Sequence, residues 1–256
     1  MSHMLIFGLG YTAARLAEAV RAMGWTVDAT GSAGNIAFTD KGAVHAALAK
    51  ATHVVSSVPP SGGSDPVLDR YGDALGAQWL GYLSSTGVYG DAEGAWVDES
   101  APTGGGRRQD RAACDARWLE AGARVFRLPG IYGPGRSAFD RVKSGKANRI
   151  DLPGQVFSRI HVDDIVAGII AGFDGPEGAY NLADDLPCPQ NTVIEEVSRL
   201  LGKAPPPLQT LEDANLSPMA LGFYSENRRV ANGKAKRVLG WQPAYRDYRA
   251  GLRALL

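Results

Sequence analysis

Short apolar runs alternate with segments of helical periodicity through the first two thirds of the chain. Leu5 to Phe7 is a compact apolar run, and Thr12 to Met23 places Leu16, Val20 and Met23 on one helical face before Gly24. The same pattern predicts strands over Trp25 to Thr30, Thr52 to Ser57, Trp79 to Ser85 and Arg124 to Leu128, and helices over His45 to Lys50, Val67 to Ala77 and Arg111 to Ala121. Strands that alternate with helices favour a parallel sheet covered on both faces.

The pattern loosens after about residue 133. It predicts strands over Phe157 to Val162 and Tyr180 to Leu182, and helices over Asp163 to Gly172, Gln190 to Leu201, Lys234 to Leu239 and Tyr248 to Leu256. We therefore expect an α/β protein with a Rossmann-type doubly wound parallel sheet and a small, partly interleaved C-terminal α/β substrate lobe. The expected division is an NAD(P)-binding domain over residues 4–133 with parts of 155–185, and the lobe mainly over 134–256. Met1-Ser2-His3 is set apart from this fold.

Composition and charge exclude several classes of protein. Lys plus Arg equals Asp plus Glu at 27 each, so no net field favours nucleic acid or an anionic membrane. The apolar start is broken by Gly8, too early for a signal peptide, and no run approaches the roughly 18 to 20 apolar residues of a membrane span. The two cysteines and four histidines show no metal-ligand spacing, so no metal site is expected. These features favour a cytoplasmic protein, a monomer or homodimer, with a small-molecule substrate.

A glycine motif follows the first apolar run directly. Gly8-Leu9-Gly10-Tyr11-Thr12-Ala13 has the GxGxxA pattern between a predicted strand and a predicted helix, the context that gives the pattern meaning. Gly8 permits a tight turn, Gly10 lets the backbone approach a pyrophosphate, and Ala13 lets the helix pack closely on the strand. The helix N-terminus then offers Tyr11 and Thr12 N–H groups to phosphates. The motif predicts a nicotinamide dinucleotide site; the alternative is a glycine-rich turn that binds nothing.

The end of the second predicted strand bears on the choice between NAD and NADP. A carboxylate there would hold the ribose 2′-OH, but the terminal residues are Gly31 and Ser32, while Asp28 lies inside the strand. Because no acid at Ser32 repels a 2′-phosphate, we favour NADP over NAD. Asp40 is a candidate acceptor for the adenine amino group; the alternative is an Asp that forms the turn before Gly42.

Five further segments resemble motifs of the extended short-chain dehydrogenases, the NAD-dependent epimerase/dehydratase family. They run in family order over nearly the whole chain: Leu83-Ser84-Ser85-Thr86-Gly87-Val88-Tyr89-Gly90, Arg127-Leu128-Pro129-Gly130-Ile131-Tyr132-Gly133-Pro134-Gly135, Ile160-His161-Val162-Asp163-Asp164, Tyr180-Asn181-Leu182 and Leu239-Gly240-Trp241-Gln242-Pro243. The chain is most similar to an atypical, poorly characterised bacterial subgroup of this family.

The resemblance implies roles for several of these residues. It implies cofactor contacts from Ser56-Ser57-Val58 at the end of the fourth strand, and from Pro129-Gly130-Ile131 near the nicotinamide. By alignment on Tyr89, Ser85 falls where the family has its catalytic Ser or Thr, and Thr86 is a candidate substrate contact. The alternative is that these hydroxyls only satisfy the end of a strand.

The family's acid–base pair is missing from the expected helix. Active members carry a Tyr four residues before a Lys on the helix after the VYG segment, whereas residues 107–120 contain neither. In an ungapped register Arg107 takes the Tyr place and Arg111 the Lys place. A guanidinium does not give up its proton near neutrality, so Arg107 cannot replace the phenol. The alternative is that these arginines form the solvated face of a surface helix. Tyr89, Tyr132 and Tyr11 remain as replacement acids.

The usual anchor of nucleotide sugars is also changed. Family members on nucleotide sugars often carry an Arg four residues before the IHV His; here that residue is Phe157, and Arg159 follows two positions later. Arg159 and Arg228 are candidate substrate contacts, or lone surface arginines. A nucleotide sugar therefore stays one candidate substrate.

Two hypotheses follow from these observations. The first is an NAD(P)-dependent oxidoreductase or epimerase-like enzyme that takes its proton from Ser85, solvent or another group. The second is a non-catalytic NAD(P)-binding sensor or scaffold, which the missing Tyr and Lys motivate. A third, weaker alternative is a vestigial glycine turn on a fold that binds only a partner protein.

Overall fold

The computed structural model describes residues 2–256 and contains the expected Rossmann-type sheet. Six parallel strands lie in the order β10-β6-β4-β3-β1-β2. The central strands are mainly apolar because helices cover both of their faces, as parallel sheets require. The strands are β1 (His3–Phe7), β2 (Thr26–Ala29), β3 (His53–Ser56), β4 (Trp79–Ser85), β6 (Arg124–Leu128) and β10 (Gly178–Asn181).

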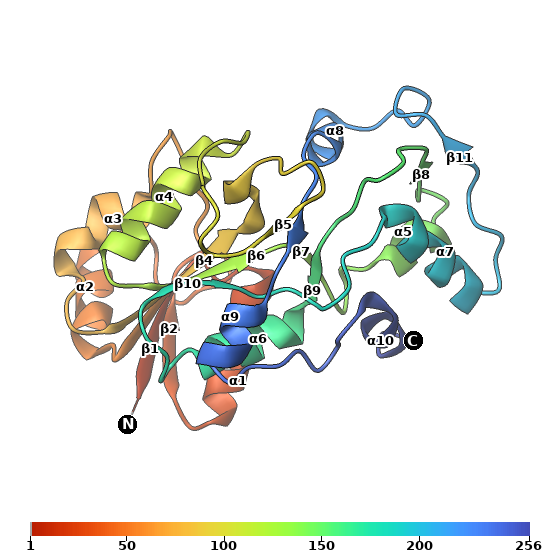
Figure 1. The fold of residues 1–256 in the computed structure, drawn as a ribbon. Helices are drawn as coiled ribbons and strands as arrows, with labels where there is room; N and C mark the ends of the chain where they lie inside the picture. Colours follow the sequence, from red (N-terminus) through yellow and green to blue (C-terminus); the bar gives the residue numbers. More distant parts are fainter. Residues whose placement is uncertain (1) are drawn as a thin grey trace.

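Two layers of helices cover the sheet, one on each face (Figure 1). One layer buries Leu16, Ile165 and Ala235 against the sheet, and the other buries Val44, Tyr71 and Trp118. The first layer consists of α1 (Tyr11–Ala22), α6 (Val162–Ala171) and α9 (Gly233–Val238), and the second of α2 (Lys41–Lys50), α3 (Pro66–Tyr71) and α4 (Gln109–Glu120). The two apolar cores therefore fix the sheet and both sets of helices as one doubly wound unit.

The strand order reverses between β1 and β3. The chain runs from β1 outward to β2 and then crosses back to β3 on the other side of β1. In open α/β sheets the ligand site lies beyond the carboxyl ends of the strands at such a switch point. Ser56-Ser57-Val58 was expected after a fourth strand, which is wrong in chain order: it follows β3, the third. Within residues 2–256, one strand, β2, lies on the side of β1 that faces away from β3. The Rossmann strand order 3-2-1-4-5-6 has two strands on that side.

A separate apolar cluster lies beside the sheet on the right of Figure 1. Phe139, Ile194, Val197, Tyr248 and Leu252 are its main members. They belong to α5 (Ala138–Lys143), α7 (Gln190–Leu200) and α10 (Tyr248–Arg253). The C-terminal part of the chain thus has a core of its own, while β10 and α6 insert into the Rossmann unit; the domain limits given above stay a prediction.

Short elements, most of which the periodicity did not predict, join the two parts. Three two-stranded parallel ladders pair segments far apart in the chain, and α8 (Pro218–Tyr224) lies between β11 and β12 in the sequence. The ladders are β5 (Trp96–Val97) with β12 (Arg229–Val230), β7 (Gly130–Tyr132) with β9 (Arg159–His161), and β8 (Arg149–Ile150) with β11 (Leu208–Gln209). Runs of two or three residues carry too little pattern to be recognised along the sequence.

Three expectations about elements are wrong. His3 belongs to β1, where its ring contacts Thr26 and Asp28, so it is part of the fold. The helix expected over Val67 to Ala77 is divided at Gly72, where the short 3₁₀ helix η1 (Gly72–Ala74) begins, since glycine is a poor helix former. The strand expected over Phe157 to Val162 is only β9, because Val162 already begins α6.

Candidate functional site

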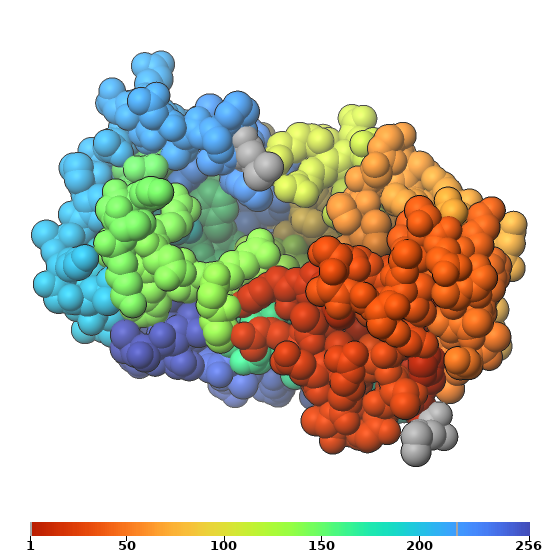
Figure 2. All heavy atoms as spheres, turned by 180° about the vertical axis from the view of Figure 1, so that it is seen from behind, coloured from red at the N-terminus to blue at the C-terminus, as the bar shows by residue number. Residues whose placement is uncertain are grey.

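A cavity of about 600 Å³ lies at the carboxyl ends of the central strands, between the sheet and the C-terminal part. Viewed from behind, the surface is hollowed where green, blue and yellow-green segments meet (Figure 2). Its wall includes the glycine turn, the end of β4, the segment after β6, and α8. Four parts of the chain far apart in sequence thus meet at the switch point.

The glycine turn has the geometry that a dinucleotide requires. Gly8 has φ +87°, and a Cβ there would stand 3.0 Å from Ser57 Oγ, so the fold itself demands glycine. Gly10 is different: its backbone is extended and a Cβ would meet nothing within 4 Å. The space beside Gly10 is therefore open for a ligand. No side chain caps α1 and no acid stands in its first turn, which leaves the N-terminal N–H groups and their partial positive charge to a phosphate.

Two neighbouring serines at the end of β3, Ser56 and Ser57, lie in different surroundings. Ser57 lies on the cavity wall, and its hydroxyl donates to the Gly8 carbonyl, which holds the turn in place. Ser56 is fully buried beside Phe7 and Tyr82 in the sheet register, and its hydroxyl finds no partner within residues 2–256. Because successive strand residues point to opposite faces, only Ser57 faces the cavity.

The residues predicted to contact adenosine lie outside the cavity wall. Asp40 Oδ1 accepts the Ala43 N–H at 3.0 Å and begins α2, so the structure shows the turn-forming role that was the alternative to adenine contact. The Asp28 carboxylate is occupied: Asn35 Nδ2 donates to it at 2.7 Å and His3 Nε2 lies 3.2 Å away. Ser32 is exposed just beyond β2. No carboxylate is therefore free at the end of β2.

A buried polar network fixes the end of β4. Arg127 of β6 makes two contacts with Asp115 of α4, and Ser84 Oγ donates to the same carboxylate at 2.6 Å. Arg127 also donates to the Tyr89 hydroxyl, which in turn donates to Asn181. The network locks β4, β6, β10 and α4 together, so the residues that follow Ser84 have a fixed position.

Ser85 and Thr86 both line the cavity. The Ser85 hydroxyl oxygen accepts the Gly87 N–H at 3.1 Å, at the start of the 3₁₀ helix η2 (Thr86–Tyr89). Its own proton is left for an acceptor in the cavity. Ser85 thus combines the strand-end role with access to a ligand.

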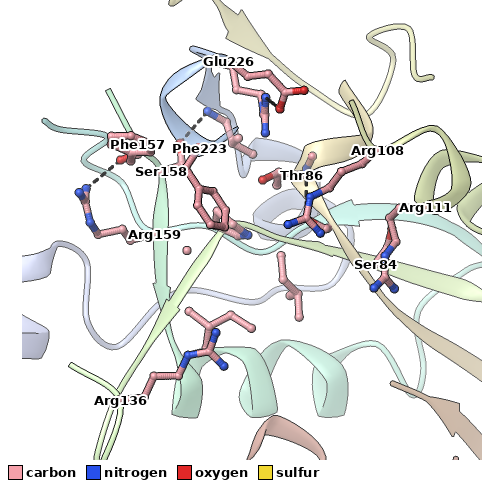
Figure 3. Close-up of a pocket in the computed structure, with 18 of the residues that line it drawn as sticks. Ser84, Thr86, Arg108, Arg111, Arg136, Phe157, Ser158, Arg159, Phe223 and Glu226 are labelled. Carbon is pink, nitrogen blue, oxygen red and sulfur yellow. Dashed lines mark hydrogen bonds and ion pairs between the residues drawn. The ribbon is translucent and has the colours of Figure 1, made fainter. Parts of the chain in front are cut away.

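The arginines at the start of α4 lie at the cavity rather than on a solvated helix face. Arg107, Arg108 and Arg111 all line it. Figure 3 shows Arg108 and Arg111 there. Arg111 Nη1 donates to the Tyr82 hydroxyl at 2.8 Å, and Arg107 Nε lies 3.7 Å from Glu226. Both guanidinium groups are therefore partly occupied by protein partners.

The phenols of the motifs are in no position to replace the missing Tyr. Tyr89 lies outside the cavity wall, and burial raises its pKa to about 12. Tyr132 faces a second, smaller cavity and burial raises its pKa. Tyr11 does line the main cavity, but its hydroxyl donates to the Pro134 carbonyl and burial raises its pKa too. Within residues 2–256 the cavity wall contains no lysine.

The two arginines predicted as substrate contacts also reach the cavity wall. Arg159 is nearly buried, and its guanidinium donates to the carbonyls of Phe157 and Cys188 and to Gln190. Arg228 Nη1 donates to the Gly90 carbonyl and to Glu226. Neither is a lone surface arginine; both also hold the lobe against the sheet.

Several residues of the wall escaped the sequence analysis. Arg108, Arg136, Arg141, Gln190, Phe223, Tyr224 and Glu226 all line the cavity. Arg108 and Arg136 stood next to recognised positions, whereas the others lie in α5, α7 and α8 or just after α8, whose packing the sequence pattern did not reveal. Seven arginines and one carboxylate line the cavity, which makes it strongly electropositive.

Two absences complete the description of residues 2–256. None of the helices there combines the length and apolar character needed to cross a membrane. In the same part of the chain, His, Cys, Asp and Glu side chains nowhere gather in a group of three that could hold a metal ion.

Comparison with solved structures places this geometry in a family. A functionally unknown conserved protein from Silicibacter pomeroyi DSS is 40% identical over 100% of this chain and 98% of its own, with a TM-score of 0.88. The human epimerase family protein SDR39U1, solved with NADPH, has the same fold with a TM-score of 0.80 at 14% identity, over 99% of this chain and 98% of its own. In fold this chain is similar to both structures, and in its motifs it resembles the extended short-chain dehydrogenases/reductases. No family model matches the sequence.

A named relative covers only part of this dehydrogenase-like chain. The 3-diazoavenalumate denitrifying reductase of a Streptomyces species is 36% identical over 140 residues, which are 50% of this chain and 45% of that protein. The chain spans about half the length of the curated relatives that it matches. The family expectation from the motifs is thus confirmed, while the substrate is not given by these relatives.

Proposed function

We propose that this chain is an NAD(P)H-dependent oxidoreductase that reduces a small anionic substrate in the arginine-lined cavity. The single observation that carries the proposal is the continuity of the cavity wall from the glycine turn through Pro129-Gly130-Ile131 to Ser85. A cofactor phosphate and a reacting substrate carbon would therefore be held in one continuous cavity.

The residues present fit a dinucleotide. The open space at Gly10, the uncapped N-terminus of α1 and the Ser57 hydroxyl that holds Gly8 would together receive the pyrophosphate. The bound cofactor supplies a hydride. Pro129-Gly130-Ile131 lies at the cavity wall where the resemblance expects the nicotinamide, and Gly130 keeps that wall narrow because a Cβ there would meet the Ser158 carbonyl at 3.4 Å.

Ser85 would orient the substrate and help to protonate it. Its oxygen is already an acceptor for Gly87 N–H, so its hydroxyl hydrogen can donate to a substrate oxygen or nitrogen. A serine hydroxyl is a weak acid, and the net proton would come from solvent through the open side of the cavity. In this scheme one hydrogen-bond donor, Ser85, and the positive charges of the wall arginines take the place of the Tyr–Lys pair.

Within this proposal, NADPH is the preferred cofactor. The Asp28 carboxylate is held by Asn35 and His3, and Gly31 and the exposed Ser32 follow shortly after the end of β2. A 2′-phosphate would thus meet no free carboxylate at this point.

The first test is direct binding of NADPH and NADH by calorimetry, followed by a reductase assay at 340 nm. The substrate panel would pair small carboxylates that carry a reducible carbonyl, C=C or N=N group with nucleotide sugars such as UDP-glucose. We expect micromolar cofactor binding and turnover of an anionic member of the panel. Absence of binding of either cofactor would refute the proposal. Tight binding with no turnover across the panel would instead favour the non-catalytic sensor, which the missing Tyr and Lys motivate.

A further inference from the structure

Positive charge is in excess at the end of the cavity where Ser85 lies. Glu226 is the only carboxylate of the cavity wall within residues 2–256. Its Oε1 accepts the Arg107 backbone N–H at 3.0 Å, and its Oε2 lies 3.0 Å from Arg228 Nη1 and 3.7 Å from Arg107 Nε. One buried carboxylate therefore serves two arginines.

Arg108 is the arginine that Glu226 leaves out. Across residues 2–256, its guanidinium has no hydrogen-bond acceptor and no carboxylate within ion-pair distance, although the side chain is partly buried. Partial burial, and after it the charges of Arg107, Arg111 and Arg228, lower the pKa of Arg108. A planar guanidinium with five free N–H donors is a ready partner for an oxyanion.

Gly87 brings this guanidinium next to Ser85. A Cβ on Gly87 would stand 2.6 Å from Arg108 Cδ, 3.3 Å from Arg108 Nε and 3.4 Å from Ser85 Oγ. Gly87 is therefore glycine because the Arg108 side chain lies across it. Ser85 and Arg108 flank the same point of the cavity wall.

Phe223 of α8 supplies an apolar surface beside the Arg108 guanidinium. Its ring is 46% exposed and lies 5.9 Å from the Arg108 guanidinium and 5.0 Å from that of Arg107. In Figure 3 the Phe223 ring and the Arg108 guanidinium both point into the middle of the cavity. Ala220 and Tyr224 of α8 also line this side. A flat apolar group would cover the ring and exclude water from the neighbouring guanidinium.

We infer that Arg108 and Phe223 form a subsite for a planar, unsaturated carboxylate, whose carboxylate meets the Arg108 fork while its flat apolar part packs on Phe223. The inference rests on the proposed function in one respect: Ser85, which would contact the reacting group of the substrate, adjoins the same subsite. It narrows the substrate to small conjugated or aromatic acids. Two parallel N–H donors of the Arg108 guanidinium match the two oxygens of one carboxylate.

The test uses trans-cinnamate as the probe, cinnamamide as its neutral isostere, and inorganic phosphate and UDP-glucose as other anions. Calorimetry on the whole chain, with and without saturating NADPH, would compare wild type with Arg108→Gln and Arg108→Lys. We expect cinnamate to bind at least tenfold more tightly than cinnamamide. Arg108→Gln should weaken the binding of cinnamate at least tenfold. Arg108→Lys should weaken it less, because a lysine keeps the charge but loses the two parallel N–H donors of the guanidinium.

Arg141→Gln is the matched control, because Arg141 lines the same cavity from α5 and is exposed. It should change cinnamate binding less than threefold, and all three variants should bind NADPH within threefold of wild type. Equal binding of cinnamate and cinnamamide, or unchanged binding in Arg108→Gln, would overturn the inference. So would phosphate or UDP-glucose binding more tightly than cinnamate in an Arg108-dependent way. Arg108-dependent cinnamate binding without any NADPH binding would uphold the subsite and refute the proposed function.

Discussion

Arg127 of β6 and Asp115 of α4 form a bidentate ion pair inside the protein, with Nη2 2.7 Å from Oδ1 and Nε 3.1 Å from Oδ2. Both side chains are at least 96% buried. Ser84 and Tyr89 complete the hydrogen bonds of the pair. Arg127, the first residue of the motif that runs to Gly135, therefore has a structural role behind the site. Ser85 has a fixed position because its neighbour Ser84 is held by Asp115.

Removal of Asp115 should destabilise the protein strongly. Asp115→Ala leaves the Arg127 charge buried without a counterion, which costs about 3–5 kcal/mol of unfolding free energy. Urea denaturation would measure it. The control is Glu195→Ala, since Glu195 pairs with Arg149 at 2.6 Å but is 43% exposed, and a loss within about 1 kcal/mol is expected. A similar loss in both variants would contradict the structural role of the buried pair.

Gly10 and Gly8 should respond differently to a side chain. Gly10→Val introduces atoms into open space, so the melting temperature should stay within a few degrees while NADPH binding weakens at least tenfold. Gly8→Ala forces φ +87° on an L-residue and a close approach to Ser57, which should cost roughly 1–2 kcal/mol of stability or more. Thermal melts and calorimetry would separate the two effects. Unchanged NADPH affinity in Gly10→Val would argue against pyrophosphate binding at the turn.

Asp184 should make the stability fall as the pH rises. Its carboxyl is nearly fully buried, and burial raises its pKa to about 8. The unfolded chain ionises this group near pH 4, so between pH 4 and 8 the folded state binds more protons than the unfolded state. The stabilising contribution of the protonated form is therefore complete below pH 4 and lost as the pH rises towards 8.

Asp184→Asn removes this dependence and keeps an acceptor for the Leu186 N–H that now bonds Oδ1. We expect the variant to gain about 1 kcal/mol or more over wild type at pH 8, relative to the difference between the two proteins at pH 5. Denaturant titrations at both values would measure it. An equal difference at the two pH values would show that Asp184 does not titrate in this range.

A carboxylate at Ser32 should shift the cofactor preference. Ser32→Asp places an acid just beyond β2, where it can accept from a ribose 2′-OH and repel a 2′-phosphate. The ratio of NADH to NADPH affinity should rise at least tenfold, as measured by calorimetry. Asp40→Asn serves as the control, since Asp40 caps α2, and its ratio should not change. An unchanged ratio in Ser32→Asp would mean that the ribose lies elsewhere.

The glycine turn and the strands around it could be predicted because each depends on neighbours in sequence. Gly8 needs its positive φ within a local turn, and β4 and β6 are mainly apolar runs that match their predicted limits. Arg108 and Phe223 could not be paired in this way. They lie 115 positions apart, and their proximity depends on how α8 packs over the end of β4.

The sequence by itself determined the Rossmann sheet, the dinucleotide turn and the loss of the Tyr–Lys pair, since these follow from periodicity and from residue identity at fixed spacing. Only the tertiary structure decided which arginines remain available. Arg107 and Arg228 share Glu226, Arg111 is held by Tyr82, and Arg159 is satisfied by backbone carbonyls. Among residues 2–256, Arg108 has none of these partners, and neither have the exposed Arg136 and Arg141 on the α5 side of the cavity. The free charge at the site is a property of long-range pairing, because a guanidinium is neutralised by whatever carboxylate or carbonyl the fold brings to it.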